Sequence, residues 1–272
     1  MPNLRSQERR FLTIKLTELG KFLEDLYARL NKREYVHPDP LEFLYHYQNP
    51  LDREIVGFIA SSLAYGRVNQ ILKSVKAVLD PMGKSPRLFI EKGNLDSFLS
   101  TYSGFKHRFT TDVELAQILE GIRITLKEHH PINSFFTKAY KKSGIVRAMS
   151  ELTAILKCSC ELPNNSMVPT PDKNSACKRL WLYLRWMVRS DEVDPGGWDD
   201  VSPSDLLVPL DTHMFSIAKQ IGFCNRNQAD MKSALEITEN FKLVSLNDPV
   251  KYDFCLTRLG IHPDFSKKML SF

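Results

Sequence analysis

Two residues of this chain, Lys178 and Asp211, have the types and positions that covalent chemistry at a carbon atom would need. Lys178 opens a segment in which apolar residues such as Leu180 and Leu184 recur at helical spacing. Prolines and glycines in 191–205 break that helix, and a second helix is predicted to begin at Asp211, whose carboxylate suits an N-cap. An amine and a carboxylate therefore stand at two helix starts, 211 − 178 = 33 residues apart in sequence.

Each residue also has an ordinary structural interpretation. A lysine at a helix start is usually solvated, and an aspartate there usually caps the helix, which stabilises it by about 1 kcal/mol. The chemical interpretation is that a lysine amine becomes a nucleophile when desolvation or a nearby cation lowers its pKa, and then forms Schiff bases. Arg179 supplies a cation, and Trp181 and Trp186 supply apolar walls. A carboxylate beside the amine could accept a proton or stabilise positive charge on a sugar carbon.

Three segments resemble one enzyme family. Residues 208–218, Val-Pro-Leu-Asp-Thr-His-Met-Phe-Ser-Ile-Ala, resemble the catalytic-aspartate segment of 8-oxoguanine DNA glycosylases, which belong to the helix-hairpin-helix glycosylase superfamily. Residues 177–179 and the apolar helix after them resemble the start of the helix that carries the Schiff-base lysine. Residues 57–62 resemble the helix that ends in a Ser-Ser pair. The whole chain also resembles a mostly bacterial family of unknown function beside these glycosylases.

The resemblance implies an all-α, two-lobed helical bundle with specific site residues. Lys178 would be the nucleophile, Asp211 its carboxylate partner, and His213 a phosphate contact. The loop 63–67 would be the wedge that fills the space left by an extruded base, with Tyr65 and Arg67 on the DNA. Further nucleic-acid contacts are expected at Lys173, Asn174, Ser175 and Arg179. Aromatic candidates for the base pocket are Trp181, Trp186 and Phe215, each equally well explained as core.

The approach to Lys178 departs from the family pattern. A typical member has a Leu-Pro-Gly-Val-Gly hairpin just before the lysine, whose amides hold a DNA phosphate, whereas residues 169–177 contain no glycine. The lysine-to-aspartate spacing is also long, because 191–205 is inserted. Both features are similar to the archaeal glycosylases of oxidised guanine, so we expect an atypical hairpin.

The function implied is DNA repair by base excision. A combined DNA glycosylase and abasic-site lyase would flip an oxidised purine out of duplex DNA and displace it through a lysine Schiff base. The alternative is a non-catalytic helical module that binds nucleic acid or a protein on the same scaffold, which the absent glycines favour. An RNA-directed enzyme on this scaffold also stays open.

Composition sets the remaining expectations. With 272 residues, 43% hydrophobic content and a net charge of +5, the chain suits a globular protein that permits a nucleic-acid surface without demanding one. No stretch approaches roughly 18 uncharged apolar residues and no signal-peptide core appears, so we expect a cytoplasmic monomer without a membrane span. The five cysteines lack metal-site spacing, so no metal, iron–sulfur cluster or other cofactor is expected.

Helical periodicity dominates the chain, and strand-like alternation is scarce. We expect a single two-lobed unit over 1–272, in which 51–143 forms a lobe with the wedge loop and 144–221 forms the helix-hairpin-helix-like region. The segments 1–50 and 222–272 would add helices that pack on these lobes. The basic, aromatic stretch 102–109 is either a contact to the DNA backbone or a solvated connection. Helices are predicted at 4–31, 41–47, 52–63, 71–79, 88–99, 113–126, 132–140, 144–156, 178–189, 211–221, 230–241 and 252–259.

Overall fold

The computed structural model describes residues 6–129, 131–158, 165–171 and 175–259. Nearly all the regular structure in these ranges is helical, which confirms the predicted all-α class. The only strands among them form a short antiparallel hairpin, β1 (Lys106–His107) and β2 (Thr110–Thr111). None of the described helices is both long and apolar enough to cross a membrane.

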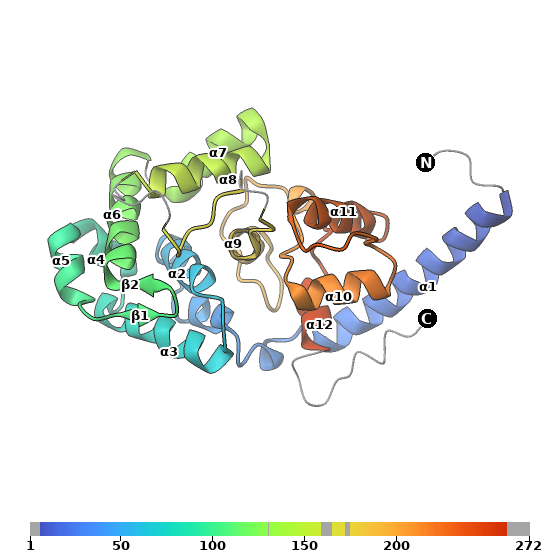
Figure 1. The fold of residues 1–272 in the computed structure, drawn as a ribbon, viewed down its shortest axis with the longest axis horizontal. Coiled ribbons are helices and arrows are strands. Elements are labelled where there is room, and N and C mark those ends of the chain that lie inside the picture. Colours follow the sequence, from blue (N-terminus) through green and yellow to red (C-terminus); the bar gives the residue numbers. More distant parts are fainter. Residues whose placement is uncertain (1–5, 130, 159–164, 172–174, 260–272) are drawn as a thin grey trace.

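Two groups of helices flank one central helix (Figure 1). The left-hand group contains α2 (Pro50–Ser62), α3 (Val68–Leu79), α4 (Pro86–Lys92), α5 (Leu95–Thr101) and α6 (Asp112–His129). To this group we add α7 (Ile132–Ser143) and α8 (Ile145–Leu156), which lie above α9 in this view and pack against α6. The right-hand group contains α1 (Ser6–Leu30), α10 (Thr212–Gln220), α11 (Met231–Lys242) and α12 (Asp253–Arg258). The central helix is α9 (Lys178–Val188), and the 3-10 turns are η1 (Arg33–Tyr35), η2 (Pro40–His46), η3 (Asp80–Met82) and η5 (Pro203–Asp205).

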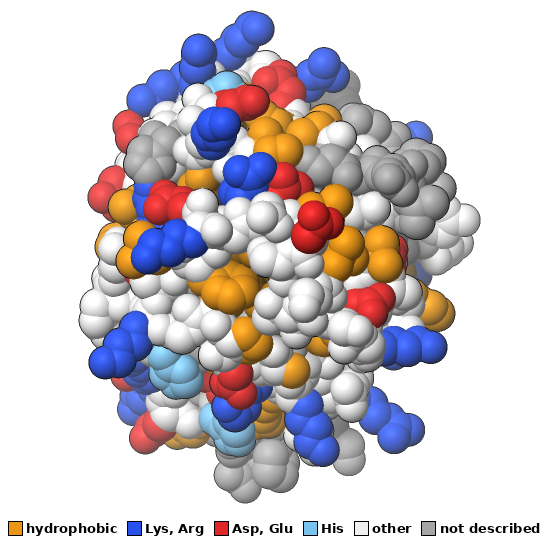
Figure 2. Space-filling model, turned by 90° about the vertical axis from the view of Figure 1, so that its left-hand side faces the viewer, with side chains coloured by type: hydrophobic (Ala, Val, Ile, Leu, Met, Phe, Trp, Pro, Cys, Tyr) orange, Lys and Arg blue, Asp and Glu red, His pale blue; other side chains and the backbone are white. Residues whose placement is uncertain are grey.

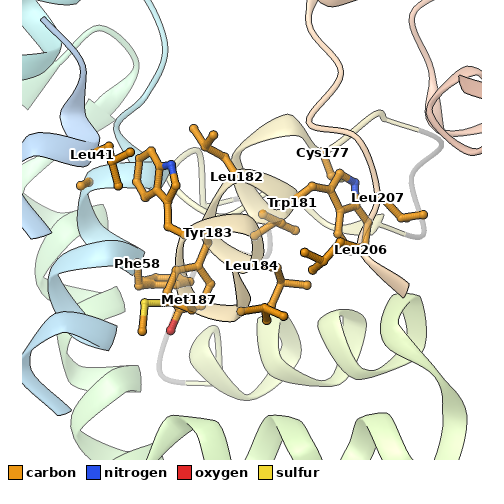
Figure 3. Packing of buried hydrophobic residues seen from close by; sticks show 14 of the residues in the cluster. Leu41, Phe58, Cys177, Trp181, Leu182, Tyr183, Leu184, Met187, Leu206 and Leu207 are labelled. Carbon is orange, nitrogen blue, oxygen red and sulfur yellow. The ribbon is translucent and has the colours of Figure 1, made fainter. Parts of the chain in front are cut away.

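Helix α9 is buried along almost its whole length, because every residue from Leu180 to Val188 lies in the core. Its aromatic residues pack in different directions: Trp181 lies against Leu206 and Leu207, and Tyr183 lies beside Phe58 (Figure 3). The rings of Phe58 and Tyr183 meet edge to face with centroids 5.5 Å apart. Only the N-terminal end of α9 reaches partly exposed positions, so the core holds Lys178 at one end of a rigid element.

Helix α8 packs against α6 and α7. The approach to α6 is close, since a Cβ added at Gly121 would lie 2.0 Å from the carbonyl oxygen of Leu156. This contact ties α8 to the left-hand group of helices. The hairpin that we predicted between α8 and α9 falls partly on 159–164 and 172–174, which lie outside the described residues.

A network of buried charges holds α9 to the segments that follow it. The Arg185 guanidinium, 3% exposed, donates from Nε to Asp194 at 3.1 Å and also pairs with Asp253. Arg189 pairs with Asp194 and donates from Nε to Asp248 at 2.9 Å. The segment 191–205, predicted as an inserted breaker of helices, also supplies the buried carboxylate of Asp194. Buried charges are costly unless they are paired, so losing one partner would destabilise this region strongly.

Surface charge on the left-hand group is mixed. Figure 2 shows basic side chains spread over this face with acidic side chains among them, and hydrophobic side chains gathered near its centre. The net charge of +5 is therefore not concentrated in one continuous basic patch on this face.

Glu54, only 1% exposed, links α2 to the start of α7 and to Trp198. Its carboxylate accepts hydrogen bonds from the backbone N–H groups of Ile132 and Asn133 at the start of α7, at 3.1 and 3.2 Å. The Trp198 indole donates a third at 3.3 Å. Burial raises the pKa of Glu54 to about 7, although these three donors act in the opposite direction.

Replacement of Glu54 by glutamine should therefore change how stability depends on pH. Because the folded protein holds this proton more tightly than the unfolded chain, Glu54 costs stability as pH rises from about 4.5 to about 7. We expect the free energy of unfolding of wild type relative to Glu54→Gln to fall across this window by up to about 3 kcal/mol. Urea unfolding of both proteins at pH 4.5, 6 and 7.5 measures this difference in the free energy of unfolding. A difference that does not change with pH would contradict the burial argument.

Candidate functional site

The two predicted helix starts meet. Lys178 is the first residue of α9 and Asp211 is the N-cap of α10, and Lys178 Nζ lies 2.7 Å from Asp211 Oδ2. The two side chains are 33% and 30% exposed, so the pair is neither sealed in the core nor fully solvated. A charged amine and a carboxylate in this position are accessible to a ligand.

Asp211 uses its two carboxylate oxygens differently. Oδ2 faces Lys178, whereas Oδ1 accepts hydrogen bonds from the backbone N–H groups of His213 and Met214 at 2.9 and 2.8 Å. Burial acts to raise the pKa of Asp211. The charge and hydrogen bond of Lys178 and the two backbone donors outweigh it, so the pKa of Asp211 lies below its usual value. The carboxylate is therefore ionised at neutral pH and held in one orientation.

The backbone changes direction just before Lys178. Cys177 has φ 47°, in the left-handed region that residues other than glycine rarely adopt. Its N–H donates to Ser175 Oγ at 3.3 Å, and exposed Ser175 pairs with Asp230 across an isolated β-bridge. These contacts orient the first turn of α9. The predicted contacts Lys173 and Asn174, which precede this turn, lie outside the described residues.

Lys178 and Asp211 line a cavity of about 440 Å³. Its other walls come from the start of η2, the turn between α2 and α3, and α12. A second hollow of about 370 Å³ shares Tyr65, Lys178 and Asp211 with the first and extends along residues 175–179. The amine and carboxylate therefore stand where two hollows adjoin, one bounded by α12 and the other by the entry to α9.

Helix α12 contributes buried polar groups that we did not predict from the sequence. Asp253 and Arg258 line the larger cavity and are 5% and 3% exposed. Asp253 pairs with Arg185, and Arg258 pairs with Asp39. Even so, Asp253 Oδ1 and Arg258 Nε lack a hydrogen-bond partner within the described part of the chain. The sequence signal was two charged residues inside the short, otherwise mostly apolar segment 252–259.

The predicted wedge loop is folded into the protein. Leu63 is fully buried, and the Tyr65 hydroxyl donates to the carbonyl oxygen of His107 at 2.9 Å and lies 2.7 Å from Thr110 Oγ1. Tyr65 therefore forms part of the wall of both hollows, and its hydroxyl is bonded to the hairpin. Arg67 is exposed at the start of α3, where a contact to nucleic acid is sterically open.

Arg179 also differs from the prediction. Its guanidinium donates to the carbonyl oxygens of Ser62, Met167 and Ser166 at 2.6, 3.1 and 3.0 Å. It also lies over the Tyr65 ring, 4.7 Å from the centroid. Arg179 therefore joins α9 to α2 and to 166–167, and it does not present its charge to a phosphate.

The aromatic candidates do not line the cavity. Trp181 and Trp186 are 1% and 0% exposed, so both belong to the core rather than to a base pocket. Phe215 is half-buried on α10, with the Lys219 amine 5.6 Å from its ring centroid. His213 is half-buried on the first turn of α10, beside the pair. Within the described ranges, no three His, Cys, Asp or Glu side chains are grouped to hold a metal ion.

Comparison with known proteins gives one match. The family described as "Protein of unknown function (DUF2400)" matches residues 39–262, which contain every residue of the candidate site. Neither the curated proteins nor the solved structures contain a match.

Asp211 should tolerate asparagine better than alanine. Asparagine can still accept the two backbone hydrogen bonds that cap α10, while alanine removes the cap, a difference of about 1 kcal/mol. Loss of the partly exposed ion pair itself should cost little in both variants. Urea unfolding of Asp211→Asn and Asp211→Ala measures this difference, and equal stabilities would show that the cap contributes nothing.

Proposed function

The chain belongs to the DUF2400 family, and we propose that it is a bifunctional DNA glycosylase and abasic-site lyase acting on a flipped-out, oxidised purine. The observation that supports this proposal is the contact of Lys178 with Asp211, 2.7 Å long, at the wall of a cavity large enough for a base. An amine for covalent attack and a carboxylate for charge stabilisation are the groups that this chemistry requires.

The proposed reaction begins with a proton transfer. In the resting pair Lys178 is an ammonium group, so its proton must leave before attack, and Asp211 is positioned to take it. The neutral amine then forms a bond to the deoxyribose C1′. The bond from C1′ to the base breaks and its electron pair leaves with the base, to which Asp211 passes the proton that it took from Lys178. The carboxylate of Asp211, ionised again, stabilises the positive charge that develops on the sugar.

The covalent intermediate then cleaves the strand. When the sugar ring opens, its oxygen takes a proton and the nitrogen of Lys178 becomes a Schiff base with C1′. Loss of a proton from C2′ pushes electrons toward this cationic nitrogen and expels the 3′-phosphate by β-elimination. Water later hydrolyses the Schiff base and releases the lysine. The protein needs no redox group for these steps.

The larger cavity suits a base that presents both donors and acceptors. Asp253 would accept a hydrogen bond from a ring N–H, and Arg258 would donate one to a carbonyl oxygen. Phe254 adds an aromatic wall, with the Arg258 guanidinium 4.6 Å from its ring centroid. Guanine and its oxidised forms offer N–H groups beside carbonyl oxygens, so a base of the guanine type fits these two groups.

Two observations favour the alternative, a non-catalytic nucleic-acid- or protein-binding module. The approach to Lys178 has no glycine, and Arg179 is committed to carbonyl oxygens inside the protein. In that case Lys178 and Asp211 would stabilise only the packing of α9 against α10. Covalent trapping separates the two proposals, because a binding module forms no adduct.

Borohydride should trap a covalent adduct between this protein and duplex DNA that carries an oxidised guanine or an abasic site. Lys178→Gln should abolish the adduct, since reduction requires the Schiff base. Lys76→Gln is a matched control, because Lys76 also contacts an aspartate at 2.7 Å, at Asp80 on the exposed end of α3. Gel separation of labelled DNA measures the adduct. No wild-type adduct on any substrate, from folded protein that binds the DNA, would support the binding module instead.

Asp253→Asn tests recognition of the base separately from attack on the sugar. We expect it to lower trapping on the base-bearing duplex at least tenfold while trapping at an abasic site, which has no base to recognise, changes little. Asp248→Asn is the control: Asp248 also pairs with an arginine and has an unpartnered oxygen among the described residues, but it does not line the cavity. Equal losses on both substrates would mean that Asp253 acts only through folding.

A further inference from the structure

The β1–β2 hairpin presents an aromatic side chain to solvent at its turn. Phe109 is 72% exposed, the largest fraction among the large hydrophobic side chains of the described residues. The guanidinium of its neighbour Arg108 lies 5.5 Å from the ring centroid. A single exposed hydrophobic side chain is common on protein surfaces. Whether Phe109 has a function therefore depends on how the turn is held in place.

The turn is braced by a network of buried polar contacts. His107 is 1% exposed and its ring is hydrogen-bonded to Ser74 Oγ at 2.8 Å and to the carbonyl oxygen of Tyr65 at 3.1 Å. Thr110, fully buried, contacts the Tyr65 hydroxyl at 2.7 Å and Ser166 Oγ at 2.8 Å. Both residues that flank Arg108 and Phe109 are therefore fixed, and Phe109 is held away from the core.

Backbone strain is concentrated at the same turn. Arg108 has φ 53°, and within the described ranges only Cys177, beside Lys178, shares this left-handed conformation without being glycine. The Arg108 side chain passes over Gly66, where an added Cβ would lie 2.8 Å from Arg108 Cδ. Gly66 also lines the larger cavity. Strained residues of this kind tend to gather at functional sites, and here both lie beside the hollows that adjoin at Lys178.

Charge near the turn favours a polyanion. Lys106, Arg108 and Arg67 are all exposed, and none of them forms an ion pair with another described residue. Asp112, the nearest acid in sequence, accepts a hydrogen bond from the Gly104 N–H at 2.7 Å, which orients it toward the base of the hairpin. Three exposed basic side chains on the hairpin and at the start of α3, one of them beside the exposed ring of Phe109, are suited to a strand of nucleic acid, in which phosphates alternate with bases.

We propose that the turn Arg108–Phe109 enters duplex DNA beside the cavity: Phe109 inserts against a base step, and Arg108 contacts a flanking phosphate. This inference rests on DNA as the ligand of the proposed function, but not on the lysine chemistry. It assigns to the hairpin the role that the buried Leu63 and the anchored Tyr65 cannot fill. The insertion would offset the cost of unstacking while the base beside it moves toward Lys178.

The test uses the full chain and a duplex with an abasic site flanked by 2-aminopurine, a base whose fluorescence rises when it unstacks. Wild type should raise the fluorescence on binding. Phe109→Ser should lose most of this rise and weaken binding roughly tenfold. Leu246→Ser is the matched control, since Leu246 is 70% exposed in the segment that follows α11, a helix of the right-hand group, whereas the hairpin lies on the left (Figure 1). Arg108→Gln should reduce the slope of log affinity against log salt concentration by about 1.

The outcomes separate this inference from the proposed function. If Phe109→Ser binds and unstacks DNA as the wild type does, the hairpin inference is overturned, whatever the borohydride experiment shows. Phe109-dependent binding and unstacking without any borohydride adduct would retain the hairpin inference and reject the lysine chemistry. Wild-type protein that binds no duplex would overturn both.

Discussion

Burial of α9 is the constraint on which the rest of this structure depends. A helix that carries Arg185, with Arg189 directly after its last residue, can lie in the core only if those charges are matched, and carboxylates from three separate segments match them. The segment 191–205, α12 and residue 248 are thereby held against one helix. Because the helix is buried from Leu180 onward, the backbone of its first residue, Lys178, is held at the edge of the cavity.

The candidate site forms where the starts of α9 and α10 meet. The start of α9 provides the amine, the start of α10 provides the carboxylate, and α12 closes the cavity. Asp211 satisfies two amides of α10 with one oxygen and Lys178 with the other. Its orientation is therefore maintained by the folding of α10 itself, before any ligand arrives. Such preorganisation is what electrostatic stabilisation of a charged intermediate needs.

The features that were predictable from sequence are those that depend on neighbours in the chain. The start of α10 at Asp211 depends on capping, which acts over three residues, and helical periodicity placed α9 correctly. Arg179 shows the limit: it and Lys178 are adjacent basic residues, and only the packing of α2 against α9 decides which of them meets carbonyl oxygens. The partners of Arg185 lie 9 and 68 residues away, beyond any local pattern. The hairpin was missed because its turn has arginine where glycine or asparagine is usual.

Tyr65 connects the wall of the two hollows to the β1–β2 hairpin. Its ring belongs to the wall of both hollows, and its hydroxyl is bonded to the hairpin on either side of the turn. Any displacement of the hairpin must either break these bonds or carry the ring with it and reshape the wall. Occupancy of the cavity and the position of the hairpin are then thermodynamically linked, and the linkage is reciprocal. A ligand in the cavity would thereby stiffen the hairpin through Tyr65.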